Sequence, residues 1–250
     1  RWKAPDIKTI SGLVILAEAK LASGDAKTAV SLYLKAAKNS RNPNVAERAV
    51  FLARQAGTGN QIEEALNRWQ EIDPNSLGLH EATVIYAAEY DQSNLLQMSL
   101  TKLMNSEVDY RAHWLASFWL GLSKERQQNF LEIITRVAMD SINGSLAMVV
   151  AEAKNRLISS SGTEWLDAWI GSRSPPANVV LFRSRLELPE RKRAIAYLER
   201  FTEVNEDLNV RAQLARWHGL EGNNETARTI LRSLIEDDSS RHQDLLTLSI

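Results

Sequence analysis

The segment SGDAKTAVSLYLKAAK (residues 23–38) decides the fold, because it reads as a short turn followed by one amphipathic helix. Apolar residues recur at helical spacing after the Ser-Gly-Asp turn. The face that they form carries small side chains at Ala29 and Ala36, and its single aromatic residue, Tyr33, lies between them. We expect the small residues to let a neighbouring helix approach closely, while Tyr33 fills the wider gap beside it.

The residues before this segment predict a second helix that pairs with the first. Its apolar positions are Ile10, Leu13, Val14, Ala17 and Leu21. The same alternation of amphipathic segments and short polar turns continues along the chain, and no stretch shows the period of two that strands require. A Ser161-Glu164 pair predicts the capping box of a further helix. The sequence therefore predicts an all-α protein of about fourteen helices in six to seven helical hairpins.

The hairpins recur with a period near 34 residues. Turns are expected at Gly24, Gly57 and Asp91, which are 33 and 34 residues apart, and Ala194 and Ala227 are also 33 apart. A period near 34 built of paired helices is the signature of the tetratricopeptide repeat. We expect a tetratricopeptide-like right-handed α-solenoid.

The repeat pattern predicts a single domain over residues 1–250. Residues 105–175 are the most degenerate part, where the repeat is inferred from helix rhythm alone. Two adjacent prolines favour a bend near 158–178, because the residue before a proline prefers extended backbone. Trp165 and Trp169 share a helix face, where they either form an aromatic ledge for a ligand or fill gaps between degenerate repeats.

Composition excludes several classes of function. Thirty Lys and Arg against 31 Asp and Glu give a net charge of −1, so the chain as a whole has no attraction for nucleic acid. The absence of cysteine excludes disulfides, thiolate zinc sites and cysteine nucleophiles. The chain starts at Arg1 without an initiator Met or an apolar leader, so we expect a mature or trimmed fragment, in which any upstream signal or lipid anchor would not be visible.

Motifs of catalysis do not stand out in the sequence. The four histidines are scattered without a second ligand at metal-binding spacing, and no nucleophile motif or phosphate-binding loop is recognisable. An enzyme would need titratable residues converging in one pocket. We therefore expect a non-enzymatic protein that holds no metal and no cofactor.

Resemblance to tetratricopeptide proteins implies that a protein or peptide binds in a concave groove lined by the first helix of each hairpin. The candidates for that groove are Glu18, Glu47, Phe51, Arg54, Glu81, Ile85, Arg183 and Arg216. The Lys and Asn clamp that holds a C-terminal carboxylate in chaperone-binding members is absent. The groove is acidic early and basic later, which suits a folded or extended protein partner.

Two further stretches narrow the resemblance. NPNVAERAVFLARQAG (residues 42–57), followed by Trp69 five residues before Pro74, and LFRSRLE (residues 181–187) resemble tetratricopeptide outer-membrane lipoproteins of Gram-negative bacteria. Those lipoproteins are adaptors for a periplasmic carboxyl-terminal processing protease. The resemblance implies a periplasmic, outer-membrane-associated protein, anchored through an N-terminal lipid site that is missing here, with the protease and cell-wall hydrolases as partners. Family members are generally longer, which puts the second binding surface of an adaptor in doubt.

Two functions stay open on the sequence. One is an adaptor that holds a protease together with its substrates and so raises their effective concentration. The alternative is an envelope or cytoplasmic assembly module that self-associates as a homo-oligomer or organises a single partner. Glu47 and Arg48 are either contact residues or an ion pair that locks one repeat to the next.

Overall fold

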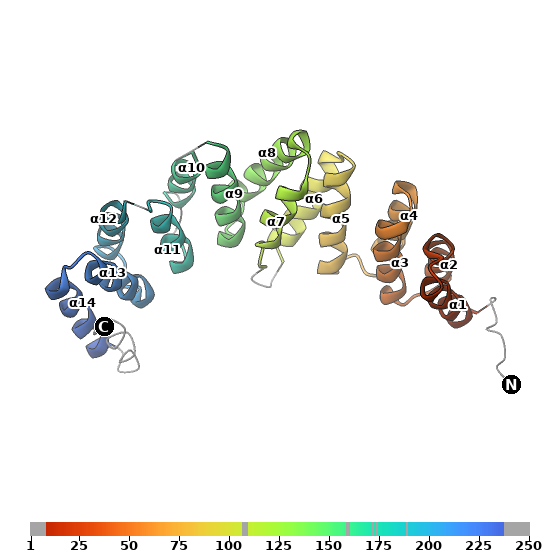
Figure 1. Cartoon of the computed structure of the whole chain (residues 1–250), viewed down its shortest axis with the longest axis horizontal. Helices are drawn as coiled ribbons and strands as arrows, with labels where there is room; N and C mark the ends of the chain where they lie inside the picture. The colour runs from red at the N-terminus through yellow and green to blue at the C-terminus, as the bar shows by residue number, and fades with distance from the viewer. Residues whose placement is uncertain are drawn as a thin grey trace. The chain divides into compact units, whose positions relative to one another are not determined.

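The fold is entirely helical over the residues that the structure describes. The computed structural model describes residues 9–106, 110–158, 161–171, 173, 175–188 and 190–237. This part of the chain contains fourteen α-helices and no β-strand (Figure 1). In chain order they are α1 (Ile10–Ala22), α2 (Ala26–Asn39), α3 (Pro43–Ala56), α4 (Gly59–Ile72), α5 (Leu77–Glu89), α6 (Ser93–Met104), α7 (Trp114–Gly121), α8 (Lys124–Asp140), α9 (Gly144–Leu157), α10 (Ser161–Ile170), α11 (Ala177–Arg185), α12 (Arg191–Thr202), α13 (Leu208–Leu220) and α14 (Asn224–Asp237).

Consecutive helices pack as hairpins, and this confirms the tetratricopeptide-like solenoid expected from the period. α1 packs on α2, α3 on α4, α5 on α6, α9 on α10, α11 on α12 and α13 on α14. Neighbouring hairpins also contact each other, for example through α2 and α3 or through α12 and α13. A stack of this kind buries the apolar face of each hairpin against its neighbours.

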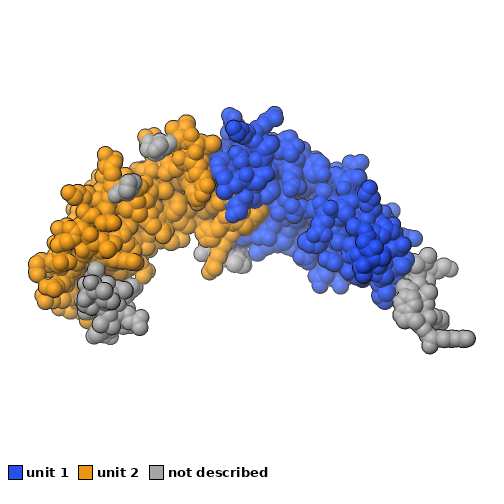
Figure 2. Space-filling model, viewed as in Figure 1, with its two compact units in different colours: residues 1–110, 117–137 blue, residues 111–116, 138–250 orange. Residues whose placement is uncertain are grey.

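The chain divides into two compact units (Figure 2). One unit comprises residues 1–110 and 117–137, and the other comprises residues 111–116 and 138–250. The expectation of one domain over residues 1–250, bent near 158–178, stays a prediction, and residues 159–160, 172 and 174 lie outside the described part.

The turns fall where the period places them. Gly24, between α1 and α2, has a φ of +83°, and Gly222, at the equivalent place between α13 and α14, has a φ of +84°. This left-handed backbone is accessible to glycine without a steric cost. Asp91 takes the same role between α5 and α6 with a φ of 54°. At the intervening turn, Thr58 forms a capping box that begins α4.

The face of α2 that carries Ala29, Tyr33 and Ala36 lies in the core of the first unit. Ala29 and Ala36 are fully buried, and Tyr33 is 4% exposed. Tyr33 Oη reaches across to α1 and donates a hydrogen bond to Glu18. The small residues are therefore placed where helices meet closely, as expected, and the tyrosine spans the space between two helices.

In the second unit, α10 lies unusually close to α9. A Cβ atom on Gly162 would overlap the carbonyl oxygen of Ala151 and lie 2.8 Å from its carbonyl carbon, so only glycine fits there. The predicted capping box at Ser161 is wrong: the Ser161 hydroxyl donates to the Lys154 carbonyl, and Asn155 accepts from the backbone of Gly162 at 2.7 Å instead. A side chain from the preceding helix thus caps α10.

The two tryptophans of α10 fill space inside the second unit. Trp169 is 1% exposed and donates its indole N–H to the carbonyl of Ala138 at 2.9 Å. Trp165 is half-buried and packs against the same apolar cluster. Of the two interpretations left open, the structure supports gap filling and does not support an aromatic ledge.

Candidate functional site

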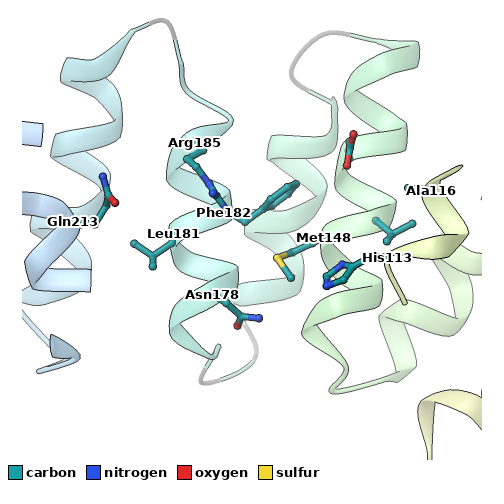
Figure 3. Close-up of a pocket in the computed structure, with 10 residues that line it drawn as sticks. His113, Ala116, Met148, Asn178, Leu181, Phe182, Arg185 and Gln213 are labelled. Carbon is teal, nitrogen blue, oxygen red and sulfur yellow. The ribbon is translucent and has the colours of Figure 1, made fainter. Parts of the chain in front are cut away.

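A pocket of about 410 Å³ opens in the second unit on the first helices of three successive hairpins (Figure 3). Helices α9, α11 and α13 contribute most of its wall, and the segment before and at the start of α7 contributes the remainder. The lining residues are His113, Ala116, Met148, Val149, Glu152, Asn178, Leu181, Phe182, Arg185 and Gln213. These are first helices of hairpins, the class of helix that the sequence predicts to line a groove.

Helix α11 shows how the sequence builds this wall. Val179, Val180, Arg183 and Ser184 form its buried face. The helical period then places Leu181 and Arg185, one turn apart, on the side that faces the pocket. Figure 3 shows Leu181, Phe182 and Arg185 on this helix, with Met148 of α9 across from them. The side of α11 that lines the pocket is therefore the side opposite its buried face.

The lining has an apolar floor and a polar rim. Met148 and Val149 are buried residues of α9, and Leu181 and Phe182 are half-buried residues of α11. Asn178, Gln213 and His113 supply groups that can donate or accept hydrogen bonds. Such a surface offers burial for an apolar group together with polar contacts that orient it.

The two oppositely charged side chains that line the pocket, Glu152 and Arg185, differ in whether they already form an ion pair. The Glu152 carboxylate is paired with Arg156 one turn along α9, at 2.8 Å. Arg185 is exposed, and within the part of the chain that the structure describes it has no acidic partner. His113 places its Nδ1 3.5 Å from the Ser145 hydroxyl. Among the described residues of this rim, the free cation is therefore the Arg185 guanidinium.

Several groove candidates of the first unit are already engaged by side chains of neighbouring helices. Glu18 pairs with Arg48 of α3 at 3.2 Å, so Arg48 ties α3 to α1 and is not paired with Glu47. Arg54 faces Glu89 of α5 at 3.5 Å. These ion pairs link first helices of neighbouring hairpins.

Five further candidates lie on α3, α5 and α13. Glu47 is exposed on α3, where Phe51 is 49% exposed beneath the Arg48 guanidinium. On α5, Glu81 accepts a hydrogen bond from the Tyr110 hydroxyl at 2.7 Å, and Ile85 is half-buried. On α13, Arg216 is exposed and is not among the residues that line the pocket.

Arg183 lies in the interior and not on a groove, which corrects its assignment as a surface contact. Its side chain is 7% exposed and forms ion pairs with Asp167 at 2.6 Å and with Glu187 at 2.8 Å. It also stacks over the ring of Tyr197, 4.7 Å from the centroid. A buried arginine with two carboxylate partners holds helices together, so we assign Arg183 a structural role.

Sequence reasoning missed the pocket residues on α9 and α11. The repeat is degenerate there, and the alignment from the 33-residue spacing placed Arg183 on the wrong side of α11. The pair Val179-Val180 was the available signal, because two adjacent β-branched apolar residues mark the buried face of a short helix. With that face fixed, Leu181 and Arg185 follow as residues of the opposite face.

Two features of other functional classes are absent from the residues that the structure describes. They contain no group of three or more His, Asp or Glu side chains placed to hold a metal ion. None of their helices combines the length and apolar character needed to cross a bilayer.

The chain is similar to solved structures of repeat proteins at low sequence identity. No family model matches the sequence, and no curated protein matches it. A tetratricopeptide repeat protein from Parabacteroides merdae is 12% identical, with 97% of this chain and 100% of that chain covered and a TM-score of 0.41. The flexible tandem repeat domain of a bacterial cellulose synthase is 16% identical, with 81% and 88% covered and a TM-score of 0.36. Pseudomonas aeruginosa pilF is 14% identical, with 82% and 96% covered and a TM-score of 0.35. At these values no function follows from the likeness.

Proposed function

We propose that this chain is a non-enzymatic scaffold that binds a protein partner at the pocket on α9, α11 and α13. One observation carries the proposal: first helices of three successive hairpins contribute to a single pocket with an apolar floor and a polar rim. A segment of a partner that crosses these helices contacts all three at once. Repeat stacks present extended surfaces of this kind to other chains.

The finer proposal is that the scaffold is an adaptor for a periplasmic carboxyl-terminal processing protease. Its support is the resemblance of residues 42–57 and 181–187 to such adaptors. Residues 181–185 of the second stretch belong to α11 and include three pocket residues, Leu181, Phe182 and Arg185. A periplasmic location, attachment to the outer membrane and capture of cell-wall hydrolases belong to the same proposal.

The test measures binding between the purified chain and the purified processing protease of the source bacterium by surface plasmon resonance. Asn178→Trp fills the pocket from an exposed position near the start of α11. Asn205→Trp, after α12, makes the same exchange at an exposed asparagine outside the pocket. We expect the protease to bind the parent and the Asn205 variant, and to bind the Asn178 variant at least about tenfold more weakly.

Other outcomes separate the alternatives. If the protease binds the Asn178 and Asn205 variants equally well, its binding site lies outside the pocket. Absence of binding by the parent contradicts the adaptor, and sedimentation equilibrium then tests the assembly module. A concentration-dependent mass above that of one chain supports self-association, and a constant single-chain mass excludes it.

A further inference from the structure

We infer that the pocket on α9, α11 and α13 selects extended peptide segments in which an acidic side chain lies within two residues of a large apolar one. This inference rests on the proposed function, because it names the chemistry of the partner segment for the same pocket. Two observations support the inference. One is which charged side chains at the rim are already paired, and the other is that the apolar floor lies beside the unpaired one.

The acidic preference follows from which charges around Arg185 are already paired. Glu152 is held by Arg156 at 2.8 Å, and Glu187 is held by Arg183 at 2.8 Å. Arg185 is left exposed at the end of α11, with no acidic partner among the described residues. A free guanidinium offers two parallel N–H donors that match a carboxylate. The group that complements this rim is therefore an anion.

The apolar preference follows from the floor. Met148 lies between α9 and α11 beside His113, and Phe182 faces the same space from α11 (Figure 3). Methionine is unbranched and polarisable, so it adapts its shape to different apolar side chains and packs well against aromatic rings. A large apolar side chain from a partner would displace water from Met148, Leu181 and Phe182.

The helix geometry sets the spacing of the two groups. Phe182 and Arg185 are three residues apart on α11, which is about 4.5 Å along the helix axis. An extended peptide advances about 3.3 Å per residue. Side chains one or two residues apart in the peptide therefore reach the floor and the guanidinium together.

The polar residues of the rim suit a peptide backbone. Asn178 and Gln213 both line the pocket, from α11 and α13 respectively. A carboxamide both donates and accepts, so it can pair with the N–H and the C=O of a peptide unit. The chain has a net charge of −1, and Arg185 is the one arginine or lysine among the described residues that line the pocket. A nucleic acid backbone requires several such basic groups.

Selection from a phage library of random dodecapeptides on the immobilised full chain tests the inference. We expect the enriched peptides to share an Asp or Glu within two residues of a large apolar residue. In a synthetic copy of the strongest binder, exchange of the acidic residue for its amide should weaken binding about tenfold. Arg185→Glu should weaken the parent peptide to a similar extent, and binding should fall as salt concentration rises.

Arg232→Glu is the matched control, because Arg232 of α14 is an exposed arginine of the same unit outside the pocket lining. Thermal unfolding of all variants checks that the fold is retained. Enriched peptides without an acidic residue, or peptides that bind the Arg185 and Arg232 variants equally, overturn the inference. If such peptides do not bind the Asn178→Trp variant, the pocket does bind protein segments. The proposed function then stands, and only the inference fails. If no peptide is enriched, the inference fails, and the protease measurement decides the proposed function separately.

Discussion

The guanidinium of Arg183 meets the carboxylate of Asp167 through two parallel hydrogen bonds, Nε to Oδ1 at 2.6 Å and Nη2 to Oδ2 at 2.7 Å. The third nitrogen donates to Glu187 at 2.8 Å, and the guanidinium plane covers the ring of Tyr197. Because Asp167 lies on α10 and Tyr197 on α12, one side chain of α11 connects three successive helices. This side chain therefore joins α11, which carries part of the pocket wall, to the helices before and after it.

We expect Arg183→Lys to lower the free energy of unfolding by about 2 kcal/mol. Lysine keeps the charge but cannot form the two parallel bonds, and it leaves buried donors and acceptors poorly paired. The expected cost is below that of a fully buried pair, because the Asp167 side chain is 47% exposed. Urea unfolding followed by circular dichroism measures the change.

Arg216→Lys makes the same exchange at an exposed position and should leave the midpoint unchanged within error. Asp167→Asn should destabilise the chain less than the Arg183 variant does, since Glu187 still neutralises the guanidinium. If Arg183→Lys unfolds at the same urea concentration as Arg216→Lys, the ion-pair network does not stabilise this unit.

The position of Arg183 shows where sequence periodicity stops being informative. Repeat spacing identified the helical hairpins, the turns at Gly24 and Asp91, and the buried small residues such as Ala29, because these depend on local conformation and residue size. An arginine is normally read as a surface residue. Its burial depends on Asp167 in the preceding helix, and a repeat period does not predict pairings of this kind.

Gly162→Ala should destabilise the second unit by about 3 kcal/mol. The added methyl group would overlap the Ala151 carbonyl oxygen, which is backbone and cannot rotate away, so α9 and α10 must separate. Their separation would also strain the hydrogen bonds from Gly162 and Thr163 to Asn155. Thermal unfolding of the variant measures the loss.

Gly121→Ala is the control, because a Cβ at Gly121 meets no atom within 4 Å. Gly121 is the last residue of α7, so its replacement by alanine should leave the free energy of unfolding unchanged or raise it slightly. A Gly162 variant that unfolds at the parent temperature would show that α9 and α10 can move apart without cost.

The start of α10 illustrates a second limit of sequence reading. The Ser161-Glu164 pair fits the local pattern of a capping box, and a helix does begin at Ser161. The acceptor that satisfies its first N–H groups is Asn155, which lies in the last turns of the preceding helix. Because α9 packs closely against α10, Asn155 accepts these hydrogen bonds in place of the Ser161 side chain. A sequence pattern within one helix cannot predict an acceptor that comes from another helix.

Tyr33→Phe should lower the free energy of unfolding by about 1 kcal/mol near neutral pH. The variant keeps the buried ring and loses the hydrogen bond to Glu18, whose carboxylate is part-exposed and remains paired with Arg48. Burial, and then the nearby Glu18, raise the pKa of Tyr33 to about 12. The folded-state pKa of Tyr33 lies above its ordinary value of 10. The neutral Tyr33 hydroxyl therefore makes its full contribution to the free energy of unfolding below pH 10, and this contribution is lost as the pH rises toward 12.

The measurement compares urea unfolding of the parent and the Tyr33 variant across this alkaline range. The difference between them should shrink as the pH rises, because the parent then loses the stabilisation that the variant never had. Tyr90→Phe provides a control at an exposed tyrosine of the same unit. A difference that stays constant with pH would contradict the assigned hydrogen bond.

His80 should make the first unit less stable in mild acid. Its side chain is 5% exposed in α5, and burial is the largest cause that lowers its pKa below the ordinary value of 6.5. The charge of Lys102 acts in the same direction, whereas Asp73 and the backbone at Pro74 oppose it. The unfolded chain therefore binds a proton at a pH where the folded chain still holds neutral His80, and stability falls as the pH drops below 6.5.

His80→Gln removes this titration, so the free energy of unfolding of the parent should decline more than that of the variant between pH about 7.5 and about 5.5. Lys102→Gln should reduce the decline, because it removes one of the two causes that lower the pKa of His80. Equal declines in the parent and the His80 variant would show that other groups govern the acid response.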